Sequence, residues 1–268
     1  MQDLEIAIIQ DELDWHDPAA NRRRFDEHLR HLPPADLIVL PEMFTTGFTM
    51  AAAEHAEPMD GLTVAWMQEH ARSLDAVVCG SLIARESRFG EEQYFNRLVW
   101  AMPDGTLAHY DKRHLFRHAG ETGHYTAGAE RVVLEHRGWR IAPMICYDLR
   151  FPVWSRHCHD CDALVYVANW PAPRHFAWET LLRARAIENQ CYVIGVNRSG
   201  RDGNGLDYRG GSAVVDFLGT TLKECGSEPC AATCVLSREG LRTFRRDYPF
   251  HLDADTFRLS DWRDIRRR

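Results

Sequence analysis

The stretch IAPMICYDLRFP, residues 141–152, contains the feature on which the interpretation of the whole chain depends. Its apolar run at residues 141–145 predicts a buried strand, and Cys146, Tyr147 and Asp148 follow directly. A cysteine in such a place is often a small apolar core residue. A thiol held at the tip of a strand, where the chain turns, can also act as a nucleophile. The remaining sequence decides between these two interpretations.

Apolar runs alternate with helical patterns on both sides of this stretch. Strands are predicted at residues 4–9, 37–40, 76–83, 95–102, 107–111, 132–135, 139–145, 163–168, 192–196, 212–217, 221–224 and 231–236. Helices are predicted at residues 21–32, 63–74, 153–159, 177–189 and 238–246. No linker rich in Pro, Gly or Ser divides the sequence. We therefore predict one α/β domain over residues 1–268, with two packed sheets and outer helices, a core at about 1–240 and a C-terminal helix and tail at 241–268.

Composition narrows the class of protein. The 268 residues carry 32 basic and 39 acidic side chains, a net charge of -7, which argues against a nucleic-acid or membrane-surface partner. The N-terminus has acidic residues where a signal peptide has basic ones, and no window approaches the roughly 18 apolar residues of a membrane span. We expect a cytoplasmic protein whose eight cysteines remain thiols.

One cluster could bind a metal. Its members are His157, Cys158, His159, Asp160 and Cys161, and the Cys-x-x-Cys spacing can supply half of a zinc site. A structural zinc needs a second ligand pair, and no remaining Cys or His residues show matching spacing. We therefore expect a surface turn leading into the strand at Asp162, without a metal. A zinc or redox protein that uses this cluster remains an alternative.

Three reactive side chains share one placement, just beyond an apolar strand. They are Glu42 in IVLPEMF, Lys112 in HYDKRHLF and Cys146 in PMICYDLRFP. Ligand sites of α/β sheets gather beyond the carboxyl ends of strands. Each residue alone has a plainer explanation: Glu42 as a strand-end carboxylate, Lys112 as an exposed lysine, Cys146 as core. Their joint placement favours a catalytic site.

A carboxylate, an ammonium and a thiol together suit the hydrolysis of an amide. The carboxylate can take the thiol proton, and the ammonium, with the backbone N–H after the nucleophile, can stabilise the oxyanion. A papain-like site would need a histidine as the base instead. The sequence has 14 histidines, and spacing identifies none of them as that partner.

The three segments, in this order, resemble the signature segments of the carbon–nitrogen hydrolase (nitrilase) superfamily. The resemblance covers nearly the whole chain and implies that Glu42 is the general base, Lys112 the oxyanion stabiliser and Cys146 the nucleophile. It also implies a four-layer α-β-β-α sandwich, usually dimerised into an eight-layer block, and chemistry without a metal or organic cofactor. A second family glutamate, which positions the lysine and the substrate, corresponds to Glu121 in RHAGETGHYTAG; otherwise Glu121 is a surface-loop residue.

Within the superfamily, YDKRHLFRHAGE and YVANWPAPR look most like the bacterial omega-amidase group. That resemblance implies removal of ammonia from 2-oxoglutaramate or 2-oxosuccinamate through a cysteinyl thioester. The same machinery could act on an N-carbamoyl amino acid or a deaminated-glutathione-like amide. A binding protein without turnover is an alternative of another class, although it would be expected to lack one of the three catalytic residues.

A substrate with a free carboxylate needs a cationic clamp, and Arg174 is our candidate. An ordinary loop arginine is the alternative. We expect Arg150 to be structural and to pair with a carboxylate beneath the site. Four aromatic residues are expected to surround the substrate: Tyr147, Trp170, Phe44 and Phe116.

Overall fold

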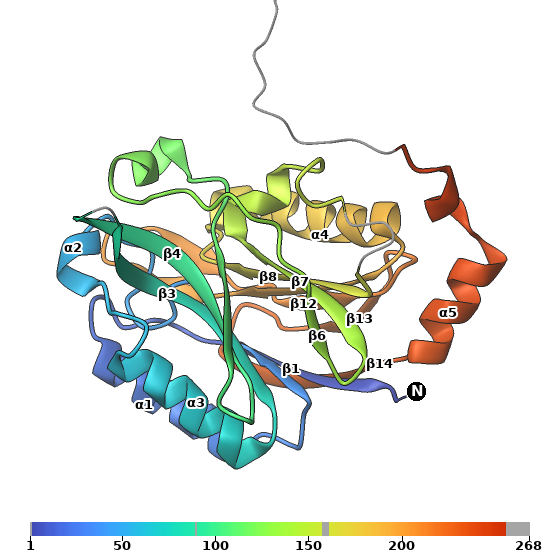
Figure 1. The fold of residues 1–268 in the computed structure, drawn as a ribbon, viewed down its shortest axis with the longest axis horizontal. Helices are drawn as coiled ribbons and strands as arrows, with labels where there is room; N and C mark the ends of the chain where they lie inside the picture. The colour runs from blue at the N-terminus through green and yellow to red at the C-terminus, as the bar shows by residue number, and fades with distance from the viewer. Residues whose placement is uncertain (1, 89, 157–160, 256–268) are drawn as a thin grey trace, which may run out of the picture.

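The computed structural model describes residues 2–88, 90–156 and 161–255. Two six-stranded sheets pack face to face, and helices cover their outer faces (Figure 1). The four layers follow the order α-β-β-α, so the predicted α/β sandwich is confirmed.

The first sheet has the strand order β14-β1-β2-β3-β4-β5. Its strands are β1 (Leu4–Gln10), β2 (Leu37–Val39), β3 (Val77–Arg88), β4 (Glu91–Ala101), β5 (Leu107–Asp111) and β14 (Cys230–Leu236). The strands β1, β2 and β3 are mutually parallel, whereas the pairings of β14 with β1, β3 with β4 and β4 with β5 are antiparallel. Helices α1 (Pro18–Arg30) and α3 (Leu62–Leu74) cover its outer face (Figure 1).

The second sheet has the order β13-β12-β9-β8-β7-β6. Its strands are β6 (Leu134–His136), β7 (Trp139–Ile145), β8 (Ala163–Ala168), β9 (Tyr192–Asn197), β12 (Ala213–Val215) and β13 (Thr221–Glu224). Here β7, β8 and β9 are parallel, and helix α4 (His175–Asn189) covers the outer face (Figure 1). The other elements are α2 (Ala52–His55), α5 (Arg238–Asp247), the hairpin of β10 (Ser199–Arg201) and β11 (Asp207–Arg209), and the 3-10 helices η1 (Arg117–Ala119), η2 (Glu121–Gly123), η3 (Cys146–Arg150), η4 (Ala172–Arg174) and η5 (Phe250–Asp253).

Side-chain alternation in β1 explains the layering. Ile6 and Ile8 belong to the core between the sheets, whereas Ala7 and Ile9 belong to the core beneath α1 and α3. Successive residues of a strand point to opposite faces, and both faces of this strand are buried. The parallel strands consequently end at common edges, where the polar residues after β2, β5, β7 and β8 meet.

Several local predictions differ from the structure. The β3–β4 hairpin is longer than predicted, reaching Arg88 and Glu91, and the β10–β11 hairpin was not predicted. The predicted helix at 153–159 is wrong in its described part, because residues 152–155 form a turn and the helical turn is η3 instead. Residues 157–160 lie outside the described residues.

The metal cluster is only partly described, because His157, Cys158 and His159 fall outside the described residues. Cys161 is 1% exposed and contacts the Cys191 thiol, so its expected place in a surface turn is wrong. Among the described residues no group of three or more His, Cys, Asp and Glu side chains could hold a metal ion.

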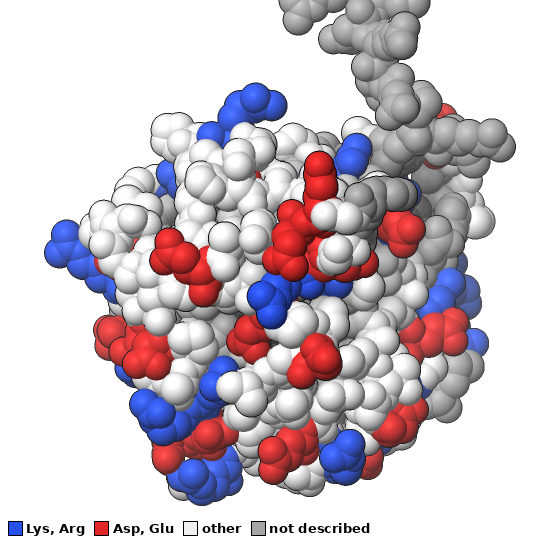
Figure 2. Space-filling view, turned by 60° about the vertical axis from the view of Figure 1, so that its left-hand side comes forward, with Lys and Arg blue, Asp and Glu red and all other residues white. Residues whose placement is uncertain are grey.

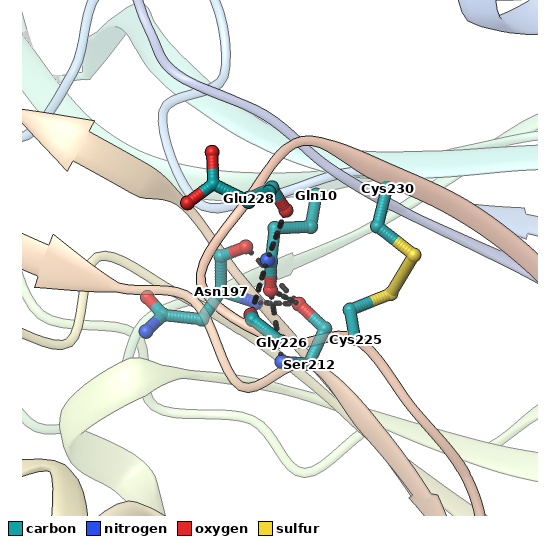
Figure 3. Close-up of a disulfide and its surroundings, with 7 residues drawn as sticks. All are labelled: Gln10, Asn197, Ser212, Cys225, Gly226, Glu228 and Cys230. Atoms are coloured by element: carbon teal, nitrogen blue, oxygen red, sulfur yellow. Dashed lines mark hydrogen bonds between the residues drawn. A yellow bond between two sulfur atoms is a disulfide. The ribbon is translucent and has the colours of Figure 1, made fainter.

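A disulfide joins Cys225 to Cys230, so the prediction that all eight cysteines remain thiols is wrong for this pair. The loop from β13 to β14 brings their Cα atoms to 6.0 Å, a distance that a disulfide spans readily. The Gln10 side chain enters this loop and donates 2.8 Å hydrogen bonds to the carbonyls of Gly226 and Glu228 (Figure 3).

Loss of this disulfide is expected to lower the free energy of unfolding. Closing so short a loop restricts the unfolded chain, which corresponds to about 2 kcal/mol. Urea unfolding of Cys225→Ser should show this loss, and Cys234→Ser, which removes a free thiol from β14, should unfold like the wild type. Equal stability of the wild type with and without dithiothreitol would contradict the expectation.

Charged side chains of both signs share the face of the molecule that Figure 2 draws. On the face in Figure 2, the described Lys and Arg side chains are interspersed with Asp and Glu and form no continuous basic area. Within residues 2–88, 90–156 and 161–255, no helix is long and apolar enough to cross a bilayer.

Candidate active site

The residues predicted to carry the chemistry meet between the two sheets. Lys112, after β5, places its Nζ 2.9 Å from Glu42 Oε1 and 2.9 Å from Glu121 Oε1. The side chains of Glu42 and Glu121 are fully buried, and that of Lys112 is 1% exposed. The sequence left open whether Glu121 lies beside Lys112 or in a surface loop. The structure places it in this buried cluster.

Asn96 of β4 bridges the two glutamates and was not predicted. Its Nδ2 donates to Glu42 Oε1 at 2.7 Å and to Glu121 Oε1 at 3.3 Å. Its Oδ1 accepts a 2.8 Å hydrogen bond from Ser81 Oγ, which fixes the amide orientation. A polar residue inside the apolar run FNRLVWA was the available signal for this role.

The other side of Glu42 is held from β8. The backbone N–H of Asn169 donates to Glu42 Oε2 at 2.7 Å, and Asn169 Nδ2 donates to the Glu42 carbonyl at 2.5 Å. Asn169 also brings its carbonyl oxygen to 4.0 Å from Cys146 Sγ. Glu42 and the Cys146 thiol are thus both contacted by one residue, which directly follows β8 of the second sheet.

Cys146 starts the 3-10 helix η3 with φ of 42°, a left-handed conformation that is uncommon outside glycine. Met43, directly after Glu42, has φ of 43°. Such backbone strain gathers at functional sites, where the surroundings hold it in place. Here it holds the thiol close enough to Glu42 for the two groups to interact electrostatically.

Burial, followed by the charge of Glu42, holds the pKa of Cys146 well above its ordinary value. Desolvation acts against the ammonium of Lys112, yet Glu121 and Glu42 keep the Lys112 pKa above its ordinary value. Burial raises the pKa of Glu121, and Lys112 opposes that rise. The resting site therefore holds a protonated thiol beside a permanent cation.

Cys146 and Lys112 open into a cavity of about 620 Å³. Tyr147, Trp170 and Phe116 line it, as predicted. Phe44 does not: it is fully buried against Phe25 of α1 and Trp66 of α3, so its predicted place in the pocket is corrected. The turn after β2 sends Phe44 into the helix layer.

Phe48, four residues later, lines the cavity in place of Phe44. Its ring centroid lies 5.0 Å from Lys112 Nζ. Residues of the β10–β11 hairpin and of the loop after β1 also line the cavity; they include Trp15, His16, Asp202, Leu206 and Tyr208.

Arg150 and Arg174 both line the cavity. The Arg150 guanidinium lies 4.9 Å from the Trp170 ring centroid, and that of Arg174 lies 5.1 Å from the Phe116 ring centroid. Neither has a carboxylate partner among the described residues, so the expected ion pair of Arg150 beneath the site is wrong. Two cations without a counter-charge suit an anionic ligand.

The fold and the Glu-Lys-Cys arrangement are those of a carbon–nitrogen hydrolase. The family model for carbon-nitrogen hydrolase matches residues 5–244, and the chain belongs to this family. It is 48% identical to omega-amidase YafV of Escherichia coli over 97% of this chain and 100% of that protein. It is 32% identical to 2-oxoglutaramate amidase of Bacillus subtilis over 83% of this chain and 86% of that protein.

A solved structure agrees with these sequence comparisons. XC1258 from Xanthomonas campestris, described as a CN-hydrolase superfamily protein with an arsenic adduct in the active site, superimposes with a TM-score of 0.94. The two sequences are 48% identical over 97% of this chain and 100% of that one. The predicted superfamily is confirmed, and the chain is an amidase-type hydrolase.

Proposed function

We propose that this chain is an omega-amidase that hydrolyses the terminal amide of a small carboxylate-bearing substrate, 2-oxoglutaramate or 2-oxosuccinamate. One observation carries the proposal: a buried Glu42–Lys112–Glu121 cluster lies beside Cys146 at a cavity lined by two guanidiniums that have no carboxylate partner among the described residues. The names of the relatives, an omega-amidase and a 2-oxoglutaramate amidase, point to the same substrates.

Acylation begins with transfer of the Cys146 proton to Glu42. The thiolate attacks the amide carbonyl, and the oxyanion is stabilised by Lys112 Nζ and by the backbone N–H of Tyr147. Glu42 then donates the proton to the amide nitrogen, the C–N bond breaks, and ammonia leaves. The acyl group remains on Cys146 as a thioester.

Deacylation uses the same base. Glu42 takes a proton from water, the resulting hydroxide attacks the thioester carbonyl, and the sulfur leaves and regains its proton from Glu42. Glu121 acts by holding Lys112, since its Oε1 accepts from Lys112 Nζ while its Oε2 accepts from the backbone N–H of Phe116. Its role is positional in this scheme.

The substrate carboxylate is bound by Arg174 together with Arg150. Arg174→Ala is expected to raise KM for 2-oxoglutaramate by about 10- to 100-fold, since a charged hydrogen bond contributes ~1.5–3 kcal/mol. The kcat should change little, because the carboxylate is bound equally in the ground state and the transition state.

Two controls separate this role from general damage. Turnover of butyramide, which has no carboxylate, should be unaffected by Arg174→Ala. Arg72→Ala, on the exposed surface of α3, should leave both substrates unaffected. A parallel loss on butyramide would show that Arg174 supports the pocket rather than the carboxylate.

The substrate assignment is tested by comparing kcat/KM of the wild type for 2-oxoglutaramate, 2-oxosuccinamate, glutamine, an N-carbamoyl amino acid and deaminated glutathione. We expect one of the two 2-oxo amides to be preferred. Preference for a different amide would keep the cysteine chemistry and refute the omega-amidase assignment.

We further propose a homodimer. Phe176 (80% exposed) and Ile187 (54% exposed) of α4 are three helical turns apart on one side, and Leu218 (59% exposed) lies in the turn whose Gly219 packs on Ile187. A second copy would cover this apolar stripe. Light scattering should give twice the mass of the chain. The single-domain organisation and the cytoplasmic location stay predictions.

A further inference from the structure

Asp148 is a fully buried carboxylate that the reaction scheme above does not use. It lies two residues after Cys146 and accepts hydrogen bonds on both oxygens. Oδ2 accepts from Tyr110 Oη at 2.7 Å and from the Ile145 backbone N–H at 3.1 Å. Oδ1 accepts from the His114 backbone N–H at 2.9 Å and from His114 Nδ1 at 2.7 Å.

These contacts join two segments from different sheets. Ile145 ends β7 and precedes the nucleophile, whereas Tyr110 and His114 stand on either side of Lys112 at the end of β5. The two oxyanion donors come from the same two segments, Lys112 Nζ from one and the Tyr147 N–H from the other. Asp148 therefore connects the supports of both donors.

The surroundings make this connection rigid. Trp154 Nε1 donates to Tyr110 Oη at 2.9 Å, and the His114 ring stacks on Phe151 with centroids 3.7 Å apart and planes 7° apart. A carboxylate is costly to bury unless its oxygens are fully hydrogen-bonded. An apolar side chain could fill this position without the cost of burying a charge. The buried Asp148 carboxylate therefore indicates that the geometry of the two segments must be fixed.

We propose that Asp148, together with His114, is a positioning pair that sets the spacing between Lys112 Nζ and the Tyr147 N–H. The inference rests on the proposed cysteine mechanism. It does not depend on which amide is the substrate.

The test is Asp148→Asn, which keeps the size of the side chain. Each Asp148 oxygen accepts from two donors, so either orientation of the amide sets an NH₂ group against two of them. We expect kcat for the amide to fall ~100-fold, the typical effect of one lost oxyanion donor. KM should stay within about 3-fold, since ground-state binding is not involved.

The rate at which iodoacetamide alkylates Cys146 distinguishes a positioning role from a structural one. Only a general disturbance of the site should change this rate. Displacement at a saturated carbon forms no oxyanion, so the alkylation rate of Asp148→Asn should stay within about 3-fold of the wild type. Equal losses of alkylation and turnover would overturn the proposal, as would unchanged turnover. Asp104→Asn, in the exposed turn before β5, is the matched control.

His114 gives a second test should Asp148→Asn fold poorly. Asn can place its Nδ2 where His114 Nδ1 donates, so His114→Asn should retain most of the kcat that His114→Ala loses. Identical kcat losses in the two variants would contradict a positioning hydrogen bond.

Release of p-nitrophenolate from p-nitrophenyl acetate separates this proposal from the substrate assignment. Acylation of Cys146 by this ester requires the oxyanion donors whatever the physiological amide. A wild type inactive on 2-oxo amides but acylated by the ester, with an Asp148-dependent rate, would refute only the omega-amidase assignment. Ester acylation that is independent of Asp148 would refute the positioning pair.

Discussion

Cys146→Ala is expected to lower amide hydrolysis by on the order of 10⁵-fold, to the background of the assay. The thiol sulfur is the atom that forms the covalent intermediate, and no other described thiol lines the cavity. Ammonia release under saturating substrate measures the effect. The carboxylate-binding wall is untouched, so the variant should still bind 2-oxoglutaramate.

Two controls accompany this prediction. Thermal unfolding of Cys146→Ala should match the wild type, because a half-buried thiol at a cavity contributes little packing. Cys191→Ala removes a buried thiol outside the cavity and should retain kcat. Hydrolysis that survives in Cys146→Ala would contradict the mechanism.

Glu42→Gln is expected to lower kcat by ~10³-fold, because one carboxylate serves as base and acid in both half-reactions. The variant keeps the shape of the residue between Lys112 and Asn169, so substrate binding should persist. Steady-state kinetics with 2-oxoglutaramate measures the loss. A kcat within tenfold of the wild type would contradict the role of Glu42.

The pH dependence of alkylation distinguishes the base from a structural carboxylate. Burial and Glu42 raise the pKa of Cys146, so the neutral thiol predominates at pH 7 and reacts by giving its proton to Glu42. In Glu42→Gln, iodoacetamide should react slowly at pH 7, and its rate should climb as pH rises and the thiol ionises. The wild type should depend less on pH between 7 and 9.

The convergence of Glu42, Lys112 and Cys146 was predictable because each follows an apolar strand, and strand ends converge in α/β sheets. Glu42, Lys112 and Cys146 therefore meet as the pattern indicated, and Glu121 joins them through Lys112. The layered fold was predictable for the same reason, since fully apolar runs require cover on both faces.

The side chains around these residues were less predictable. Phe44 and Phe48 stand on one loop, and only the turn geometry sends the first into the core and the second to the cavity. The sequence spacing of Arg150 does not reveal its contact with the Trp170 ring. The prediction therefore gave Arg150 a carboxylate partner instead.

Long-range partners were also missed. Asn96 bridges two glutamates that are 54 and 25 residues away, a relation that no local pattern encodes. The β10–β11 hairpin has no apolar alternation, because it lies over the cavity rather than in a sheet core. The Cys225–Cys230 disulfide depends on the geometry of the loop that joins β13 to β14. The spacing of the two cysteines in the sequence does not reveal that geometry.

Hydroxylamine partitioning during turnover of succinamate tests the central claim, hydrolysis of a carboxylate-bearing amide through a Cys146 thioester. Succinamate keeps the carboxylate and the terminal amide but lacks the ketone, with which hydroxylamine would react. A thioester can be attacked by hydroxylamine as well as by water. We predict succinyl hydroxamate in proportion to the hydroxylamine concentration, without slower ammonia release and with none formed by Cys146→Ala. Ammonia release without hydroxamate at any hydroxylamine concentration would contradict the thioester and the account built on it.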